Sequence, residues 1–225
     1  MKSNGRRRHS RYPTERYSGS PGERGFAFKK NKATMFLSDR FLNDAALLEA
    51  LAHKDVWSQS AGAYRWWDGW WKSPPANPIE EAIQRVWQRE ISENEIAGFE
   101  YWVNPLTEGQ ALKWHRDCDV ALHRREGRYV CPAIGNVLYV LVENVIGGFM
   151  ELSDQESLID VETSDLQRIR PVEDRLVIFN PSRWHRVTRL ARGRRLALQT
   201  NLWMQKPQTF ALGDHVDADF QPIVG

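Results

Sequence analysis

Cysteines and long apolar runs are both scarce in this sequence. Only Cys118 and Cys131 occur among its 225 residues, which excludes a disulfide framework. No segment approaches the roughly eighteen apolar residues of a membrane span, and Met1–Arg8 lacks the apolar core of a secretory signal. The sequence also has no P-loop, no dinucleotide fingerprint and no internal repeat. We therefore expect a cytoplasmic protein in a reducing compartment, without a membrane partner.

Acidic residues are scarce near the N-terminus. Residues 1–32 hold ten Lys or Arg against two Glu, which gives this segment a net charge of +8. Because the whole chain has a net charge of +2, the remaining residues carry a net charge of −6. Residues 1–25 are rich in Gly, Ser and Pro and have no apolar period, which predicts a disordered basic tail. Nucleic acid could bind only through this tail, since the rest is acidic. We expect the tail to be a solvated leader.

Residues 26–94 predict a helical N-terminal support. Ser38 is the expected cap of a helix that begins at Asp39. Asn77 is the expected cap of a second helix, with Pro78 at its first position and Glu80 completing a capping box. Both helices carry apolar residues at helical spacing, so they are expected to pack on the outside of a sheet.

Tryptophan is unusually frequent, with ten residues in the chain. Four of them, Trp66, Trp67, Trp70 and Trp71, lie within six positions. They could pack as structure between helices and barrel, or form an apolar lid over an active site. We favour the lid or its rim, because one loop cannot easily bury so many indoles.

Residues 95–205 predict a β-rich catalytic core, and residues 206–225 a C-terminal extension. Short apolar segments separated by turns are typical of a sandwich or barrel rather than of alternating helices and strands. A polar, charged connection is expected over residues 121–128. The expected strands are 98–104, 110–117, 136–143, 148–153, 174–180, 184–190 and 195–204.

His115, Asp117 and His185 carry the strongest functional signal. Residues i and i+2 of a strand face the same side, so His115 and Asp117 can reach one metal ion while Arg116 points away. Two imidazoles and one carboxylate leave the opposite metal positions open, as in the facial triad of non-haem Fe(II) oxygenases. A His-x-Asp triplet alone often arises by chance, so the rest of the chain must support it.

Further features follow this triplet in a fixed order. They are Tyr139 in an apolar run, Gly147-Gly148, the apolar segment 175–179, His185 and the segment Gly193-Arg194-Arg195. In this order the chain resembles the Fe(II)/2-oxoglutarate-dependent dioxygenases, specifically their prolyl 4-hydroxylase-like branch. The resemblance covers roughly residues 95–205. The family often has a tyrosine and a glycine at close spacing before the His-x-Asp, and here they are more widely spread.

The resemblance implies a mainly β fold, a double-stranded β-helix (jelly roll) with supporting N-terminal α-helices. It implies that His115, Asp117 and His185 hold Fe(II). It also implies that Arg195, helped by Tyr139, binds the C5 carboxylate of 2-oxoglutarate. The residue that contacts the C1 carboxylate is not identified. Asp119 is expected at most to contact a metal ligand, and not the metal itself.

Arg194 competes with Arg195 for the carboxylate. If Arg195 faces the barrel interior, so do Ala197, Gln199 and Asn201, a small and polar row that suits a pocket. The opposite parity would put an apolar row beside Arg194. Guanidinium suits the task because its planar fork grips a carboxylate and keeps its charge. We therefore expect Arg195.

The resemblance implies an oxygenase that converts 2-oxoglutarate and O2 to succinate and CO2 while it hydroxylates an amino-acid side chain, free or in a peptide or protein. Relatives that halogenate lack the carboxylate ligand, so Asp117 favours hydroxylation. One alternative is a nucleic-acid demethylase of the same chemistry, which the acidic body disfavours. Another is a non-enzymatic metal- or ligand-binding barrel, which the intact set of residues disfavours.

Overall fold

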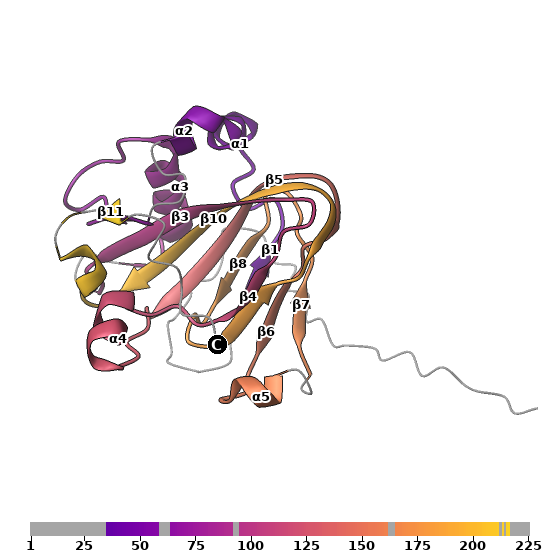
Figure 1. The fold of residues 1–225 in the computed structure, drawn as a ribbon. Helices are drawn as coiled ribbons and strands as arrows, with labels where there is room; N and C mark the ends of the chain where they lie inside the picture. The colour runs from indigo at the N-terminus through magenta and orange to yellow at the C-terminus, as the bar shows by residue number, and fades with distance from the viewer. Residues whose placement is uncertain are drawn as a thin grey trace, which may run out of the picture.

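Two antiparallel sheets form the centre of the protein (Figure 1). The computed structural model describes residues 35–58, 64–91, 95–161, 165–211, 213 and 215–216. The expected tail, residues 1–25, lies outside them. The large sheet has the order β1 (Phe36–Ser38), β8 (Leu176–Phe179), β5 (Ile134–Gly147), β10 (Leu190–Trp203), β3 (Gly98–Thr107), β2 (Tyr64–Trp67) and β11 (His215–Val216). The small sheet has the order β4 (Leu112–His115), β9 (Trp184–Val187), β6 (Met150–Ser153) and β7 (Gln167–Ile169). This architecture confirms the predicted jelly roll.

The long strand β10 organises the large sheet. It pairs with β3 over Arg194–Trp203 and with β5 on its other edge. Its side chains alternate between two cores, as a pleated strand requires. Leu198 and Leu202 belong to the core under the helices, whereas Ala197 belongs to the core between the two sheets. The strand thus presents one complete face to the interior of the jelly roll.

Two helices cover the outer face of the large sheet, α1 (Ala45–Ala52) and α3 (Pro78–Trp87) (Figure 1). Asn77 caps α3 as predicted, since its side-chain oxygen accepts from the N–H groups of Ile79 and Glu80. Glu80 reaches back to the N–H of Ala76, one residue before the cap. Helix α2 (Lys54–Ser58) follows α1.

The prediction that Ser38 caps the first helix was wrong. Ser38 ends β1, where it pairs with Leu176 of β8. Helix α1 begins at Ala45 with Asp44 as its cap, and the Asp44 side chain accepts from the N–H of Leu47. Between strand and helix, Arg40 and Asn43 have positive φ, which a helix does not allow. The apolar residues of this stretch therefore pack from an extended segment.

The tryptophan cluster is structural, so the lid interpretation was wrong. Trp66 and Trp67 are neighbours on β2 and point to opposite faces. Trp66 packs with Trp203 and Phe210, in a small core at the end of the sheet. Trp67 stacks on Phe99 at a centroid distance of 5.6 Å. Trp70 and Trp71 also contact the Phe99 ring. Because both faces of β2 are covered, one short segment buries several indoles.

The charged connection after the His-x-Asp is partly helical, unlike the prediction. Helix α4 (Val120–Glu126) begins after Asp119 and ends at Gly127, which has a left-handed φ of 67°. Gly tolerates this conformation at a helix end. Asp119, 3% exposed, accepts from Leu122 at the start of α4 and from Gln208 and Thr209 of the 3-10 helix η1 (Gln208–Phe210). It therefore acts as a structural clamp between two segments.

Replacing Asp119 by Ala is expected to lower the free energy of unfolding by about 2–4 kcal/mol, since a helix cap and several buried donors lose their acceptor. Urea unfolding followed by circular dichroism measures this. Glu108→Ala is the matched control, because Glu108 is an exposed carboxylate and should change stability by less than about 0.5 kcal/mol. Equal unfolding midpoints for both variants would refute the clamp.

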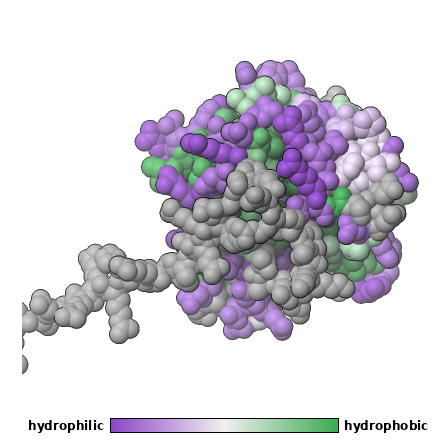
Figure 2. All heavy atoms as spheres, turned by 180° about the vertical axis from the view of Figure 1, so that it is seen from behind, coloured by the Kyte–Doolittle hydropathy of each residue, from purple (hydrophilic) through white to green (hydrophobic). Residues whose placement is uncertain are grey.

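On the face that Figure 2 shows, the described residues are mostly hydrophilic, with hydrophobic patches between them. Large apolar side chains that are exposed are few, such as Ile159 on α5 (Leu158–Val161) and Met204 after β10. In the part of the chain that the structure describes, no helix is both long and apolar enough to cross a bilayer.

Candidate active site

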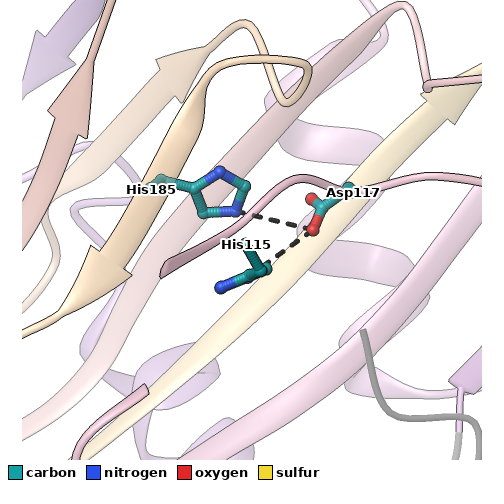
Figure 3. Close-up of side chains that lie close together, drawn as sticks. All are labelled: His115, Asp117 and His185. Atoms are coloured by element: carbon teal, nitrogen blue, oxygen red, sulfur yellow. Dashed lines mark ion pairs between the residues drawn. The ribbon is translucent and has the colours of Figure 1, made fainter. Parts of the chain in front are cut away.

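Three side chains converge between the two sheets, His115, Asp117 and His185 (Figure 3). His115 ends β4 and lies directly opposite His185 of β9 in the antiparallel register. The Nε2 atoms of His115 and His185 lie 3.7 and 3.5 Å from Asp117 Oδ1. Each residue offers one ligand atom, and these three atoms all lie within 4.8 Å of one another. A single divalent metal ion fits such a cluster of two imidazoles and one carboxylate.

Asp117 reaches the cluster from outside the strand. The sequence predicted a strand to residue 117, but β4 ends at His115. The N–H of Asp117 donates to the carbonyl of Pro181, 3.1 Å away, which ties this segment to the turn before β9. Arg116 points away as predicted: its guanidinium stacks on Trp184 and donates to the Glu156 carbonyl. The i, i+2 prediction thus holds for side-chain direction, although the backbone is irregular.

Hydrogen bonds to the backbone orient both histidines. His115 Nδ1 lies 2.8 Å from the carbonyl oxygen of Lys113, and His185 Nδ1 lies 2.9 Å from that of Arg183. A carbonyl can only accept, so each ring carries its proton on Nδ1 and keeps a free lone pair on Nε2. Partners of this kind fix the ring orientation of metal-binding histidines. Both Nε2 atoms are therefore prepared as ligands.

The electrostatics favour a neutral His115 and an ionised Asp117. Burial, together with the neighbouring His185, lowers the pKa of His115 to about 4, while Asp117 opposes the shift. Burial alone would raise the pKa of Asp117, but His185, His115 and a hydrogen bond from Asn201 outweigh it, and the pKa is lowered. Neutral imidazole and ionised carboxylate are the forms that bind a metal.

A pocket opens from the cluster toward Arg195 and Tyr139. It encloses about 460 Å³, part of it open to solvent, and its lining includes His115, Asp117, His185, Tyr139, Arg195 and Gln199. Arg195 is 2% exposed, and its Nε and Nη1 atoms have no hydrogen-bond partner. Its guanidinium lies 5.3 Å from the centre of the Tyr139 ring. The hydroxyl of Tyr139 also lacks a hydrogen bond. Unpaired buried donors are costly, so this end of the pocket suits an anionic ligand.

Arg194 lies outside the pocket, as the parity argument predicted. It is exposed and forms an ion pair with Glu143. On the inner face, Arg195 is followed by Ala197, Gln199 and Asn201, and the last two line the pocket. Burial lowers the pKa of Arg195, and Tyr139 partly offsets this. One row of β10 therefore leads from the guanidinium to the His–Asp–His cluster.

Asn201 and Glu100 support the cluster from behind. Asn201 Nδ2 donates to Asp117 Oδ2 at 3.1 Å and to Glu100 Oε2 at 3.2 Å, and Trp203 Nε1 donates to the same glutamate oxygen at 2.9 Å. Burial raises the pKa of Glu100 to about 8, the Trp203 hydrogen bond lowers it, and Asp117 raises it further. Glu100 was not among the predicted site residues.

Replacing Glu100 by Gln is expected to stabilise the metal-free protein at high pH. The folded pKa of about 8 lies above the ordinary 4.5, so the folded state holds this proton more tightly. The wild type should lose stability relative to E100Q as pH rises from about 4.5 to 8, by on the order of a few kcal/mol. Urea unfolding of both proteins across this range measures the difference. A constant difference would mean that Glu100 is solvated.

Other residues considered from the sequence lie outside the cluster. His123 is on α4, where its ring contacts Tyr129, and His53 ends α1 as its C-cap. Cys118 is buried, and burial raises the pKa of its thiol to about 12, which leaves it unreactive. Tyr101 points to the helix side of the sheet, toward Glu80. Its neighbour Trp102 faces the pocket.

Comparisons with known proteins give the following similarities. Residues 101–204 match the family model of the 2OG-Fe(II) oxygenase superfamily. The structure is similar to that of a Pseudomonas putida prolyl-4-hydroxylase, with a TM-score of 0.54, 20% identity, and 76% of this chain and 88% of that chain covered. No curated protein sequence matches the chain.

Two further solved structures are similar at lower scores. One is a viral collagen prolyl hydroxylase from Paramecium Bursaria Chlorella virus-1 in complex with 2OG, with a TM-score of 0.48, 13% identity, and coverage of 76% of this chain and 96% of that chain. The other is a Trichoplax adhaerens prolyl hydroxylase in complex with a peptide fragment, with a TM-score of 0.46, 16% identity, and coverage of 78% and 86%. At these identities the structural likeness concerns the fold.

Proposed function

We propose that the chain, as an Fe(II)/2-oxoglutarate-dependent oxygenase, hydroxylates an amino-acid side chain, because residues 101–204 match the family model of the 2OG-Fe(II) oxygenase superfamily. The side chain would belong to a free amino acid, a peptide or a protein. The fold shared with the P. putida prolyl-4-hydroxylase supports this class of substrate. A carboxylate at Asp117 favours hydroxylation over halogenation.

We propose that His115, Asp117 and His185 hold the iron. The donor set fits a divalent metal ion: two neutral imidazoles with free Nε2 atoms and one ionised carboxylate, with ligand atoms within 4.8 Å of one another. Three ligands on one side leave the remaining positions for co-substrate and oxygen. The hydrogen bond from Asn201 holds Oδ2 of Asp117, so Oδ1 is the oxygen that faces both histidines.

The C5 carboxylate of 2-oxoglutarate would bind Arg195 and Tyr139. The buried, unpaired Nε and Nη1 atoms of Arg195 and the unpaired hydroxyl of Tyr139 offer three donors at the closed end of the pocket. A guanidinium binds a carboxylate through two parallel hydrogen bonds. The observation that carries this proposal is that Arg195 shares one pocket with the cluster while its neighbour Arg194 is paired outside.

Bound iron and 2-oxoglutarate together would supply the oxidation, in which substrate, O2 and 2-oxoglutarate become hydroxylated substrate, succinate and CO2. The chain's own residues bind and orient. Arg195 and Tyr139 anchor one end of the co-substrate. Phe179 packs edge-on against His185, with ring centroids 5.1 Å apart, and Val137 lines the same pocket. These apolar neighbours keep water from the co-substrate and so favour ordered binding.

The proposed function is tested by measuring succinate with purified protein, Fe(II) and 2-oxoglutarate, alone and with a library of short peptides. We expect succinate to require both Fe(II) and 2-oxoglutarate, and to increase with one class of peptide that gains 16 mass units (one oxygen atom). Alkylated oligonucleotides serve as the comparison. Turnover stimulated by oligonucleotides and by no peptide would favour the demethylase instead.

A further inference from the structure

A second chamber lies beside Asp117, separate from the Arg195 end of the pocket. Its cavity volume is about 20 Å³, enough for one small group of the size of a water molecule or an ammonium. Three residues, Trp102, Asp117 and Asn201, line both spaces. A group held in this chamber would therefore lie next to the proposed iron position. The residues that give it its character are Tyr64, Glu100, Trp102, Asp117, Asn201 and Thr209.

Two aromatic rings form one wall of this chamber. Tyr64 on β2 and Trp102 on β3 are cross-strand neighbours, because Arg65 pairs with Tyr101 in the antiparallel register. Their ring centroids lie 5.1 Å apart and the planes are tilted by 51°. The faces of such rings attract cations, and Trp is the strongest of the aromatic residues in this respect.

Glu100 supplies a buried carboxylate to the chamber. It is 7% exposed, and both of its hydrogen bonds, from Trp203 and Asn201, go to Oε2. These donors are neutral and share one oxygen, which leaves Oε1 for a ligand. Among the described residues that line the chamber there is no Lys or Arg. A buried carboxylate without a cation is costly, and for this reason burial raises the pKa of Glu100 to about 8. A cationic ligand beside Oε1 would offset that cost and let the group ionise.

We propose that this chamber binds a positively charged nitrogen of the substrate, an ammonium group, beside the rings of Tyr64 and Trp102 and against Glu100. The substrate class is then a basic amino-acid side chain, free or in a peptide. This inference rests on the proposed function, because it assigns the chamber to the substrate of the same iron site. Two carboxylates, Glu100 and Asp117, line the chamber, and they would repel a phosphate group.

The test compares two probes that differ by one charge. They are Nα-acetyl-lysine methylamide and its norleucine counterpart, which has a methyl group in place of the ammonium-bearing end. Binding is measured by calorimetry and by tryptophan fluorescence, with protein loaded with Fe(II) and 2-oxoglutarate under argon, so that no turnover occurs. We expect saturable binding of the lysine probe and at least about tenfold weaker binding of the norleucine probe.

Variants then locate the charge that recognises the probe. Glu100→Gln should lower the affinity for the lysine probe by at least about tenfold and leave the affinity for the norleucine probe unchanged. Trp102→Leu should weaken the lysine probe by a smaller factor, about threefold to tenfold. Glu143→Gln is the matched control, since it removes an exposed carboxylate paired with Arg194 and should have no effect. Iron and 2-oxoglutarate occupancy is measured in every variant, and affinities are compared at equal occupancy.

Each outcome is decisive. Equal affinity for the two probes, or a lysine affinity that Glu100→Gln leaves unchanged, would overturn the inference. So would the absence of lysine binding to protein that holds iron and 2-oxoglutarate. Protein that fails to bind iron or 2-oxoglutarate would instead contradict the proposed function. If Glu100→Gln does not fold, the Trp102→Leu variant and the two probes on the wild type still decide.

Discussion

Replacing His185 by Ala should abolish iron binding while the jelly roll remains folded. His185 lies on β9 directly opposite His115, and both rings face Asp117. Loss of a group that hydrogen-bonds to a metal ligand typically lowers metal affinity tenfold to hundredfold. Removing one of the three ligands themselves should lower the affinity for iron by more than this. The fold should survive, because the cluster adds little apolar burial and the cores lie on either side of it.

The measurement is an anaerobic Fe(II) titration, with circular dichroism to follow the fold. His123→Ala is the matched control, because His123 lies on α4 beside Tyr129 and outside the cluster. It should bind iron like the wild type. Asp117→Ala and His115→Ala should behave like His185→Ala. Iron affinity that survives in any of these three variants would remove that residue from the metal site.

Replacing Arg195 by Ala should raise the 2-oxoglutarate requirement far more than replacing Arg194 does. Arg195 is buried with unpaired donors, whereas Arg194 is exposed and paired with Glu143. Losing a charge-assisted pair with a buried carboxylate costs on the order of 2–5 kcal/mol. That corresponds to a weakening by roughly thirtyfold to several thousandfold. Arg194→Ala should change the requirement by less than about twofold.

The readout is the dependence of succinate formation on 2-oxoglutarate concentration, with a direct binding titration as support. Tyr139→Phe should act in the same direction but more weakly, since it removes one neutral donor. An equal effect of the two arginine variants would show that charge in general, and not the pocket, determines affinity. A larger effect of Arg194→Ala would contradict the assignment of Arg195.

Strand periodicity explains how much of the site could be predicted. The parity argument along β10 separated Arg195 from Arg194 correctly, because a long central strand alternates without interruption over this stretch of its pairing with β3. The same argument on β3 would have found Glu100. Phe99, Tyr101 and Val103 belong to the core under the helices, so the residues between them, Glu100 and Trp102, face the interior. Polar residues on the inner face of a strand whose other face is apolar, such as Glu100 and Asn104 on β3, indicate candidate binding residues.

Long-range pairing explains what the sequence did not show. Ser38 has the features of a helix cap, but its neighbours pair with β8, about 140 positions later in the chain. Asp119 has the features of a residue behind the metal, but it caps a short helix and also holds η1. The prediction of a tryptophan lid fails because the partners of these indoles lie far along the chain: Trp66 packs with Trp203 and Phe210 on one face of β2, and the other three pack around Phe99 on the opposite face. Local patterns do not contain these partners.

The two ends of the proposed co-substrate site belong to different sheets. His115 and His185 are on the small sheet, whereas Arg195 is on β10 of the large sheet. 2-Oxoglutarate would therefore bridge the gap between the sheets, and that gap is set by packing at roughly 10 Å. The spacing of the two sheets would then select the length of the diacid that binds. A four-carbon oxo-diacid such as oxaloacetate is shorter by one methylene, so we expect it to span this gap less well and to bind more weakly than 2-oxoglutarate.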